Sequence, residues 1–148
     1  MAADCLFCRI ASGEVPAHII LEDEHTLAFL DHRPLFPGHC LLIPRSHYAT
    51  LTDLPGDEIE GFFANARLLS IAVEQALDAK GSLVAINNRV SQSVPHLHVH
   101  VVPRSPKDGL RGFFWPRQRY TNDAEAGGVR DKLRKAVESL KSPIVNNS

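Results

Sequence analysis

Residues 93–102 carry the strongest structural signal in the chain: Ser93-Val94-Pro95-His96-Leu97-His98-Val99-His100-Val101-Val102. Polar and apolar side chains alternate here, as in a half-buried β-strand, because successive side chains point to opposite faces of a sheet. The histidines therefore share one face, and the intervening apolar residues share the other. We expect a strand from Leu97 to Val102, with its apolar face packed under a helix.

A long helix is predicted between Asp57 and Lys80. Apolar residues recur at helical spacing along this stretch, and Gly81 follows as a stop signal. The positions that form the apolar stripe are Ile59, Phe62, Phe63, Ala66, Leu69, Val73 and Leu77.

Short apolar runs bounded by turn residues predict the remaining strands. They lie at residues 17–21, 27–30, 40–43 and 83–86. A last helix is expected from Asn122 to Leu140, with Asn122 and Glu125 as capping residues. Short connections favour hairpins, so the fold class is α+β, with a mainly antiparallel five-stranded sheet, a long central helix and a C-terminal helix.

Length and composition favour one soluble domain. The 148 residues carry a net charge of −1, which gives no general electrostatic reason to bind nucleic acid or an anionic membrane. We expect a single domain over residues 1–148, with a core at about 5–104, an arm and helix at 105–141 and a tail at 142–148. There is no secretory signal or long apolar segment, and three cysteines argue against a disulfide framework, so we expect a cytoplasmic protein.

The histidine row points to chemistry, because imidazole suits nucleophilic attack, proton transfer and metal binding near neutral pH. Hydroxyl and amide groups that could hold phosphate oxygens flank it, at Asn87, Asn88, Ser91, Gln92 and Ser93. The alternative is a surface strand with titrating histidines beside an ordinary polar loop. The complete alternation and the unusual flanks favour a functional site.

The pair Cys5 and Cys8 has three interpretations: half of a zinc site, a redox pair or two buried small residues. A redox motif would need a βαβ setting, which the pattern lacks. A zinc site would need further ligands, and His47 is one candidate.

Residues 92–102 resemble the signature of the histidine triad family, in which three histidines alternate with apolar residues after Gln-Ser/Thr-Val. The likeness extends over about residues 5–104. It includes the opening Cys5-Leu6-Phe7-Cys8-Arg9-Ile10, the run Leu27-Ala28-Phe29-Leu30-Asp31, and Pro37-Gly38-His39 with Ile43-Pro44-Arg45-Ser46-His47. The resemblance implies an α+β domain that dimerises through its central helix. Members bind nucleotides and hydrolyse or transfer nucleotidyl groups at the α-phosphate, through a covalent nucleotidyl-histidine.

The resemblance assigns roles to individual positions. His98 becomes the nucleophile and His100 a contact to the α-phosphate, with Ser93 and Gln92 near the scissile bond. Asp31 would accept bonds from the ribose hydroxyls, and Asn87 would lie on the phosphate side. The base would be sandwiched by Leu6, Phe7, Ile10, Phe29 and His32. In the zinc-bearing branch, a closed structural Zn²⁺ site would comprise Cys5, Cys8, His47 and His96.

The expected function is therefore a hydrolase or nucleotidyl transferase acting on adenosine-containing phosphoanhydrides or phosphoramidates. The stretch from Arg33 to His39 resembles dinucleoside polyphosphate hydrolases, whereas the cysteine pair resembles zinc-containing bacterial members. The alternatives are a non-catalytic nucleotide-binding module with a structural zinc, and a zinc-stabilised scaffold without a nucleotide site. The expected partners are a small nucleotide and a second copy of the chain, with no nucleic acid and no membrane.

Three features lie outside these assignments. A basic and aromatic arm either contacts the leaving group or packs on the domain, and we favour packing; it contains Arg104, Lys107, Arg111, Phe113, Phe114, Trp115, Arg117 and Arg119. Cys40 is expected to face the core. His39 is expected to make a local structural hydrogen bond.

Overall fold

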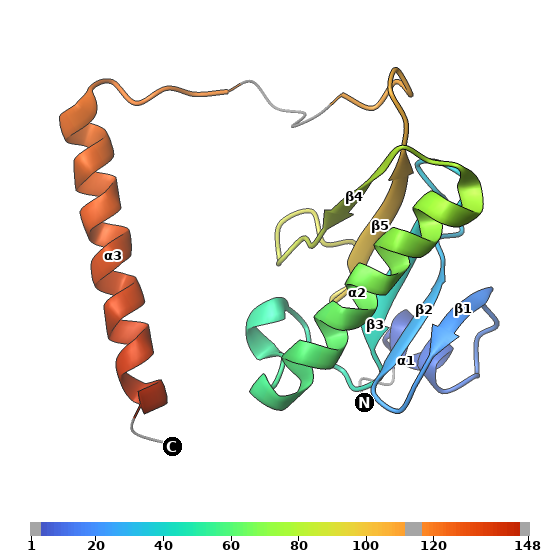
Figure 1. Cartoon of the computed structure of the whole chain (residues 1–148). Helices are drawn as coiled ribbons and strands as arrows, with labels where there is room; N and C mark the ends of the chain where they lie inside the picture. Colours follow the sequence, from blue (N-terminus) through green and yellow to red (C-terminus); the bar gives the residue numbers. More distant parts are fainter. Residues whose placement is uncertain (1–3, 112–116, 146–148) are drawn as a thin grey trace. The chain divides into compact units, whose positions relative to one another are not determined.

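The computed structural model describes residues 4–111 and 117–145, the side chains of 142–145 excepted. It divides into two compact units, Met1–Gly109 and Leu110–Ser148. The first contains a five-stranded sheet in the order β1-β2-β3-β5-β4, in which every neighbouring pair is antiparallel (Figure 1). Its strands are β1 (Ile19–Glu22), β2 (Thr26–Leu30), β3 (Cys40–Pro44), β4 (Gly81–Ala85) and β5 (Val99–Arg104). The predicted five-stranded antiparallel sheet is confirmed.

Helix α2 (Gly56–Leu77) covers one face of this sheet. Its buried side chains are Phe62, Ala66, Leu69 and Val73. They form one core with residues of the central strands and the segment before β5: Ala28, Leu42, Leu97, Val99 and Val101. The central helix and the apolar face of the histidine segment are therefore confirmed. The predicted apolar stripe of the helix is only partly buried, because Ile59, Phe63 and Leu77 are 40% to 48% exposed.

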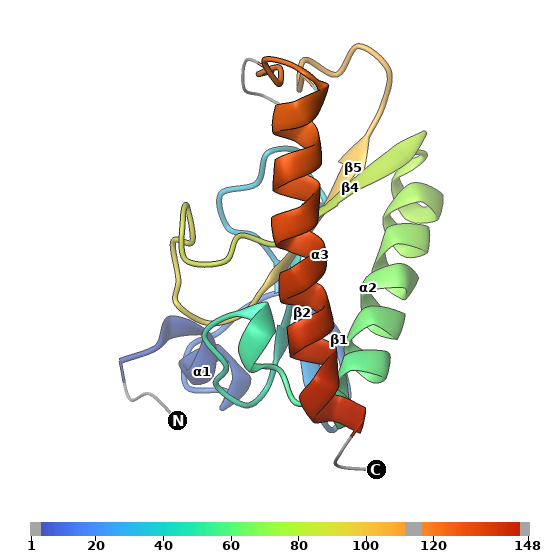
Figure 2. The same cartoon turned by 90° about the vertical axis from the view of Figure 1, so that its left-hand side faces the viewer.

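A second core lies on the opposite face, under the short helix α1 (Leu6–Ala11). Figure 2 shows α2 on one side of the sheet and α1 on the other. Alternate side chains of β2 belong to opposite cores, because Ala28 packs with α2 whereas its neighbours Leu27 and Phe29 pack with α1. Sequence periodicity did not predict α1, which has only six residues. A single 3₁₀ turn (Leu51–Asp53) leads into α2.

Strand β5 begins two residues later than predicted, at Val99 instead of Leu97. The Leu97 N–H donates to the carbonyl of Tyr48 at 2.7 Å, beyond the end of β3. Regular pairing with β3 begins only where Val99 faces Leu42. Similarly, β1 begins at Ile19 and not at Ala17.

The second unit contains α3 (Asp123–Val145). Asn122 caps it as predicted, because its Oδ1 accepts the backbone N–H of Glu125 at 2.9 Å. The helix extends five residues past the expected end at Leu140. The expected packing of the aromatic arm concerns Phe113, Phe114 and Trp115, which lie outside the described residues. The expectation of one domain over residues 1–148 stays a prediction. Of the helices described, none combines the length and apolar character that crossing a membrane requires.

Candidate active site and metal centre

A cavity of about 700 Å³ lies on the sheet face opposite α2, a size suited to a small-molecule ligand. It brings together His98, His100, Ser93 and Asp31, which the sequence assigned to phosphate and ribose. The five residues expected around the base also line it: Leu6, Phe7, Ile10, Phe29 and His32. The lining thus combines apolar and aromatic side chains with imidazole, hydroxyl and carboxylate groups.

The orientation of the His98 ring leaves one nitrogen able to act as a nucleophile. Its Nδ1 lies 2.7 Å from the carbonyl oxygen of His96, and a carbonyl can only accept, so Nδ1 carries the proton. The lone pair therefore belongs to Nε2. Phe7 packs edge-on against the ring, with centroids 5.1 Å apart, and only 3% of the residue is exposed. The ring is buried in the wall of the cavity and held in one tautomer.

His100 lies beside His98, with ring centroids 4.9 Å apart. Burial lowers the pKa of His100 to about 4, and the neighbouring His98 and His39 rings add to the effect. The ring is therefore neutral at physiological pH. A neutral imidazole can contact a phosphate oxygen only through its single N–H, so the position of that proton decides what His100 can do.

Asp31 lies directly after β2 and lines the cavity. Its Oδ1 accepts the backbone N–H of Arg33 at 2.9 Å, which orients the carboxylate. Its side chain is 17% exposed. The group can thus accept hydrogen bonds from hydroxyl groups of a bound ligand.

Two residues assigned to the site do not line the cavity. Gln92 braces the loop before the histidine segment: its Oε1 accepts the Arg89 N–H at 2.8 Å, and its Nε2 donates to the Ala49 carbonyl at 2.6 Å. Asn87 is exposed and does not line the cavity. In the same loop Ser91 has a φ of 60°, a left-handed conformation that serine rarely adopts.

The cysteine pair forms part of a second cluster. Ligand atoms of Cys5, Cys8, His47 and His96 all lie within 4.8 Å of one another. Each measured Sγ to Nδ1 separation is between 3.3 and 3.5 Å. Tetrahedral zinc with ordinary Zn–S and Zn–N bonds requires a separation of about 3.5 Å, so the donor set and its spacing fit Zn²⁺.

The His96 ring is oriented for metal binding by its other nitrogen. Its Nε2 donates to the Pro44 carbonyl at 2.8 Å, so Nδ1 presents its lone pair to the two sulfurs. Burial lowers the pKa of His96 to about 4, which keeps the ring neutral, as metal ligation requires. Because four protein ligands complete a tetrahedron, a metal held here would be structural.

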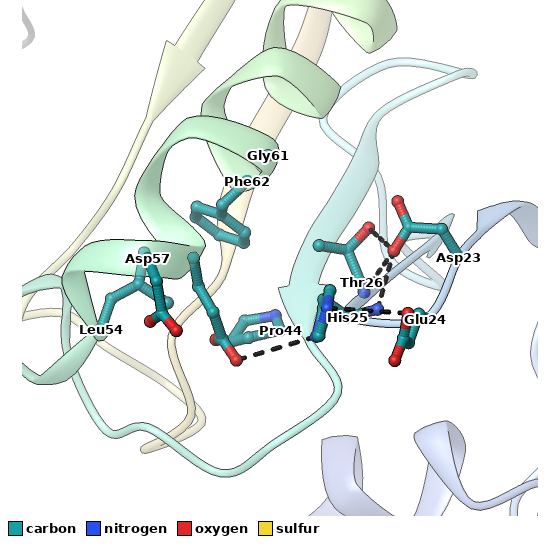
Figure 3. Close-up of a pocket in the computed structure, with 10 residues that line it drawn as sticks. Asp23, Glu24, His25, Thr26, Pro44, Leu54, Asp57, Gly61 and Phe62 are labelled. Carbon is teal, nitrogen blue, oxygen red and sulfur yellow. Dashed lines mark hydrogen bonds and ion pairs between the residues drawn. The ribbon is translucent and has the colours of Figure 1, made fainter.

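A smaller cavity of about 250 Å³ lies at the start of α2 (Figure 3). It shares no lining residue with the larger one. Asp23 at its edge accepts bonds from the backbone of His25 and Thr26 and from the side chain of Asn65. This carboxylate organises the turn before β2, so the larger cavity is the better candidate for chemistry.

Comparisons with known proteins agree with this geometry. The HIT domain model matches residues 12–107. An uncharacterized HIT-like protein of Methanocaldococcus jannaschii is 41% identical over 107 residues, covering 71% of this chain and 82% of that protein. The adenosine 5′-monophosphoramidase of Saccharomyces cerevisiae is 36% identical over 137 residues, covering 92% of this chain and 84% of that enzyme.

Among solved structures, a zinc-bound histidine triad family protein from Mycobacterium smegmatis superposes with a TM-score of 0.69 at 38% identity. The match covers 95% of this chain and 97% of that one. The HIT domain model matches well over half of the chain, and the fold and the sequence both agree with those of the solved family structure. The chain belongs to the histidine triad family.

Proposed function

We propose that the protein is a nucleotidyl hydrolase or transferase that attacks the α-phosphorus of adenosine-containing phosphoramidates or phosphoanhydrides. The observation that carries this proposal is the His98 ring, whose Nδ1–H is bound to the His96 carbonyl in the wall of a cavity that also contains Asp31 and His100. The bond makes Nε2 the nucleophilic nitrogen. The yeast relative, named as an adenosine 5′-monophosphoramidase, supports the substrate class.

In the proposed reaction, the Nε2 lone pair of His98 forms a bond to the α-phosphorus, and the bond to the leaving group breaks. The leaving group takes its electron pair and a proton from solvent water. A second water then attacks the same phosphorus and gives up one proton to solvent, the N–P bond breaks and its electrons return to Nε2, releasing the nucleoside monophosphate. His100 and Ser93 would donate to the non-bridging oxygens, where charge builds up in the transition state. Asn87 and Gln92 are assigned no contact to phosphate, because neither lines the cavity.

The binding half of the proposal rests on the cavity lining. Asp31 would hold the ribose hydroxyls, and the base would lie between Phe7, Phe29, Ile10, Leu6 and His32. The Asp31 carboxylate lines the cavity from the end of β2, together with His98 and His100. A ribonucleotide would thus be held along its length, with the phosphorus next to His98.

The test compares His98→Ala with the unmodified protein on adenosine 5′-monophosphoramidate and diadenosine polyphosphates. Turnover should fall at least about a thousandfold. Affinity for the nucleoside monophosphate should change little, because the base and ribose contacts remain. His25→Ala is the matched control, since His25 lies outside the larger cavity, and its turnover should be unchanged.

A covalent nucleotidyl group should also be detectable by mass spectrometry after rapid quenching, on the unmodified protein and not on His98→Ala. Full turnover by His98→Ala would refute the nucleophile. A protein that binds nucleotides tightly and turns over none of the panel would instead be the non-catalytic nucleotide-binding module.

We also propose that Cys5, Cys8, His47 and His96 hold one structural Zn²⁺, which the donor spacing supports. Thiolate ligands must be reduced, which favours the cytoplasm as the place of action. Elemental analysis should find about one zinc per chain. Cys5→Ser and Cys8→Ser should lose it, whereas Cys40→Ser should retain it because Cys40 lies outside the cluster. Native protein that is stable without metal would contradict the assignment.

We also propose that the protein forms a homodimer through α2, because the outward face of this helix carries exposed apolar side chains. Apolar side chains there and on neighbouring β4 are 40% to 46% exposed: Ile59, Phe63, Ile71 and Val84. Burying them against a second copy would remove this apolar area from water. Phe63→Glu should yield monomers in sedimentation experiments, and Val90→Glu, on an exposed loop, should not. Equal masses for both variants would argue against this interface.

A further inference from the structure

His39 has a contact that the sequence did not predict. It precedes β3 and is 3% exposed, although histidine is more often found partly exposed. Its Nε2 lies 3.0 Å from Nδ1 of His100, on the neighbouring strand β5. One of the two nitrogens in this hydrogen bond must donate and the other must accept, so the tautomer of one ring determines the tautomer of the other.

The backbone determines which nitrogen donates. The N–H of Leu35 donates to Nδ1 of His39 at 3.1 Å, so that nitrogen has a lone pair and no proton. The proton of a neutral His39 ring is therefore on Nε2, and Nε2–H donates to Nδ1 of His100. His100 must then carry its own proton on Nε2. Burial lowers the pKa of both rings, which is consistent with this neutral arrangement.

We propose that His39 is a positioning residue that holds His100 in the Nε2–H tautomer, so that His100 can donate to a phosphate oxygen in the cavity. This inference rests on the proposed function, which places a nucleotide phosphate there. The relay runs from the Leu35 amide through His39 to His100, and from His100 to the substrate. His98 and His100, adjacent in the cavity, thereby present opposite atoms: a lone pair on His98 and an N–H on His100.

A metal ion is the competing interpretation, because Asp31, His39 and His100 also place ligand atoms within 4.8 Å of one another. Ligation through Nε2 of His39 would move the proton of that ring to Nδ1. Two donors, Nδ1–H and the Leu35 N–H, would then face each other at 3.1 Å. The hydrogen-bonded relay satisfies both nitrogens, and the metal does not.

Asp31 connects the relay to the ribose side of the cavity. Its Oδ2 lies 3.6 Å from the same Nε2 of His39, near enough to attract the proton electrostatically. The carboxylate proposed to hold the ribose therefore lies beside the hydrogen bond from His39 to the imidazole proposed to hold the phosphate.

Two substitutions at His39 separate the relay from packing. Gln can place an amide N–H near the position of Nε2 and keep a donor for His100, whereas Met fills similar space without one. Both variants equally lose the Nδ1 that accepts the backbone N–H of Leu35. With adenosine 5′-monophosphoramidate, His39→Met should lower kcat about three- to tenfold, the size expected for one hydrogen bond, and His39→Gln should recover most of it. KM should change less than kcat, because His100 acts on the charge that develops during reaction.

Nitrogen NMR of the imidazole rings provides the second readout. In the unmodified protein and in His39→Gln, His100 should show a protonated Nε2 and an unprotonated Nδ1, whereas His39→Met should show a mixture. Equal loss of kcat in both variants with an unchanged His100 tautomer would overturn the proposal. Should His39→Met fail to fold, a protonated Nδ1 on His100 in the unmodified protein would still overturn it. This measurement needs no substrate, so it separates failure of the relay from failure of the proposed function.

Discussion

Gly38→Ala is expected to destabilise the fold next to the relay. Gly38 has a φ of 99°, in the region that residues with a Cβ rarely adopt. It also lies against the end of α2, where an added Cβ would overlap with Cδ1 of Leu77 and come within 3.5 Å of Pro103. The position thus requires glycine for both its backbone conformation and its space.

The cost can be worked out from these two contributions. A side chain forced to positive φ costs about 1–2 kcal/mol. The overlap costs less, because Leu77 is 48% exposed and its side chain can rotate away for about 1 kcal/mol. The free energy of unfolding should therefore fall by about 2–3 kcal/mol. For a chain of this length, Tm should fall by about 6–12 °C.

Thermal and denaturant unfolding of matched variants provide the assay. Gly61→Ala is the control, since Gly61 lies within α2 and nothing surrounds its added Cβ within 4 Å. The same substitution there should raise the free energy of unfolding by about 0.5–1 kcal/mol. Adding Leu77→Ala to Gly38→Ala should remove the overlap and leave the backbone strain. A Gly38→Ala protein as stable as the unmodified one would refute the reasoning.

Three further predictions follow from the site. The pKa of His100, lowered to about 4 by burial and by the His98 and His39 rings, lies below the 6.5 of an unfolded chain. Between these two values the unfolded chain therefore binds more protons than the folded chain. The contribution of His100 to the free energy of unfolding should be fully present above pH 6.5 and should be lost as the pH falls toward 4, by at most about 3 kcal/mol. Denaturant titrations at pH 7 and 5 would show this, and an equally steep decrease in His100→Gln would contradict the assignment. Chelation of the proposed zinc should increase hydrogen exchange most in α1, because Cys5 and Cys8 would connect that helix to the metal; unchanged exchange in α1 after chelation would contradict this. Asp31→Asn should raise KM for a ribonucleotide substrate about tenfold by losing charge-assisted bonds to the hydroxyls, and should affect the 2′,3′-dideoxy analogue far less; steady-state kinetics on both analogues would decide.

Much of the fold was predictable, because the spacing of apolar residues along the chain indicates which face of a helix or strand is buried. The period of two in residues 97–101 and the helical period in α2 predicted the two surfaces that form the main core. The boundaries were less predictable, because β5 begins where β3 can pair with it, and this depends on residues about 57 positions earlier in the chain. Helix α1 gave no periodic signal, and its N-cap is Cys5, whose sulfur accepts the Cys8 N–H, in place of a common capping residue.

The composition of the site was also predictable in part. The resemblance to the family led to His98, His100, Ser93 and Asp31, and the structure places all four around one cavity. Gln92 shows the limit, because a sequence pattern gives its position and not the partners of its amide, which are the backbone N–H of Arg89 and the backbone carbonyl of Ala49. His39 was underestimated for the same reason. Its partner His100 is 61 residues away, and only the register of β3 against β5 brings the rings together.

The structure explains how three histidines with the same chemistry and spacing can present different atoms. Strand alternation sets only the side on which each ring lies. The proton of each ring is placed by a different partner: the Pro44 carbonyl for His96, the His96 carbonyl for His98 and the His39 ring for His100. The partners of His96 and His100 lie at the end of β3 and just before it, so the pairing of β3 with β5 determines these two tautomers, whereas the partner of His98 lies in the histidine segment itself. A change that shifts this register while keeping every histidine should therefore disturb the tautomers of His96 and His100 together and leave that of His98, whereas a change at one partner should affect one ring alone.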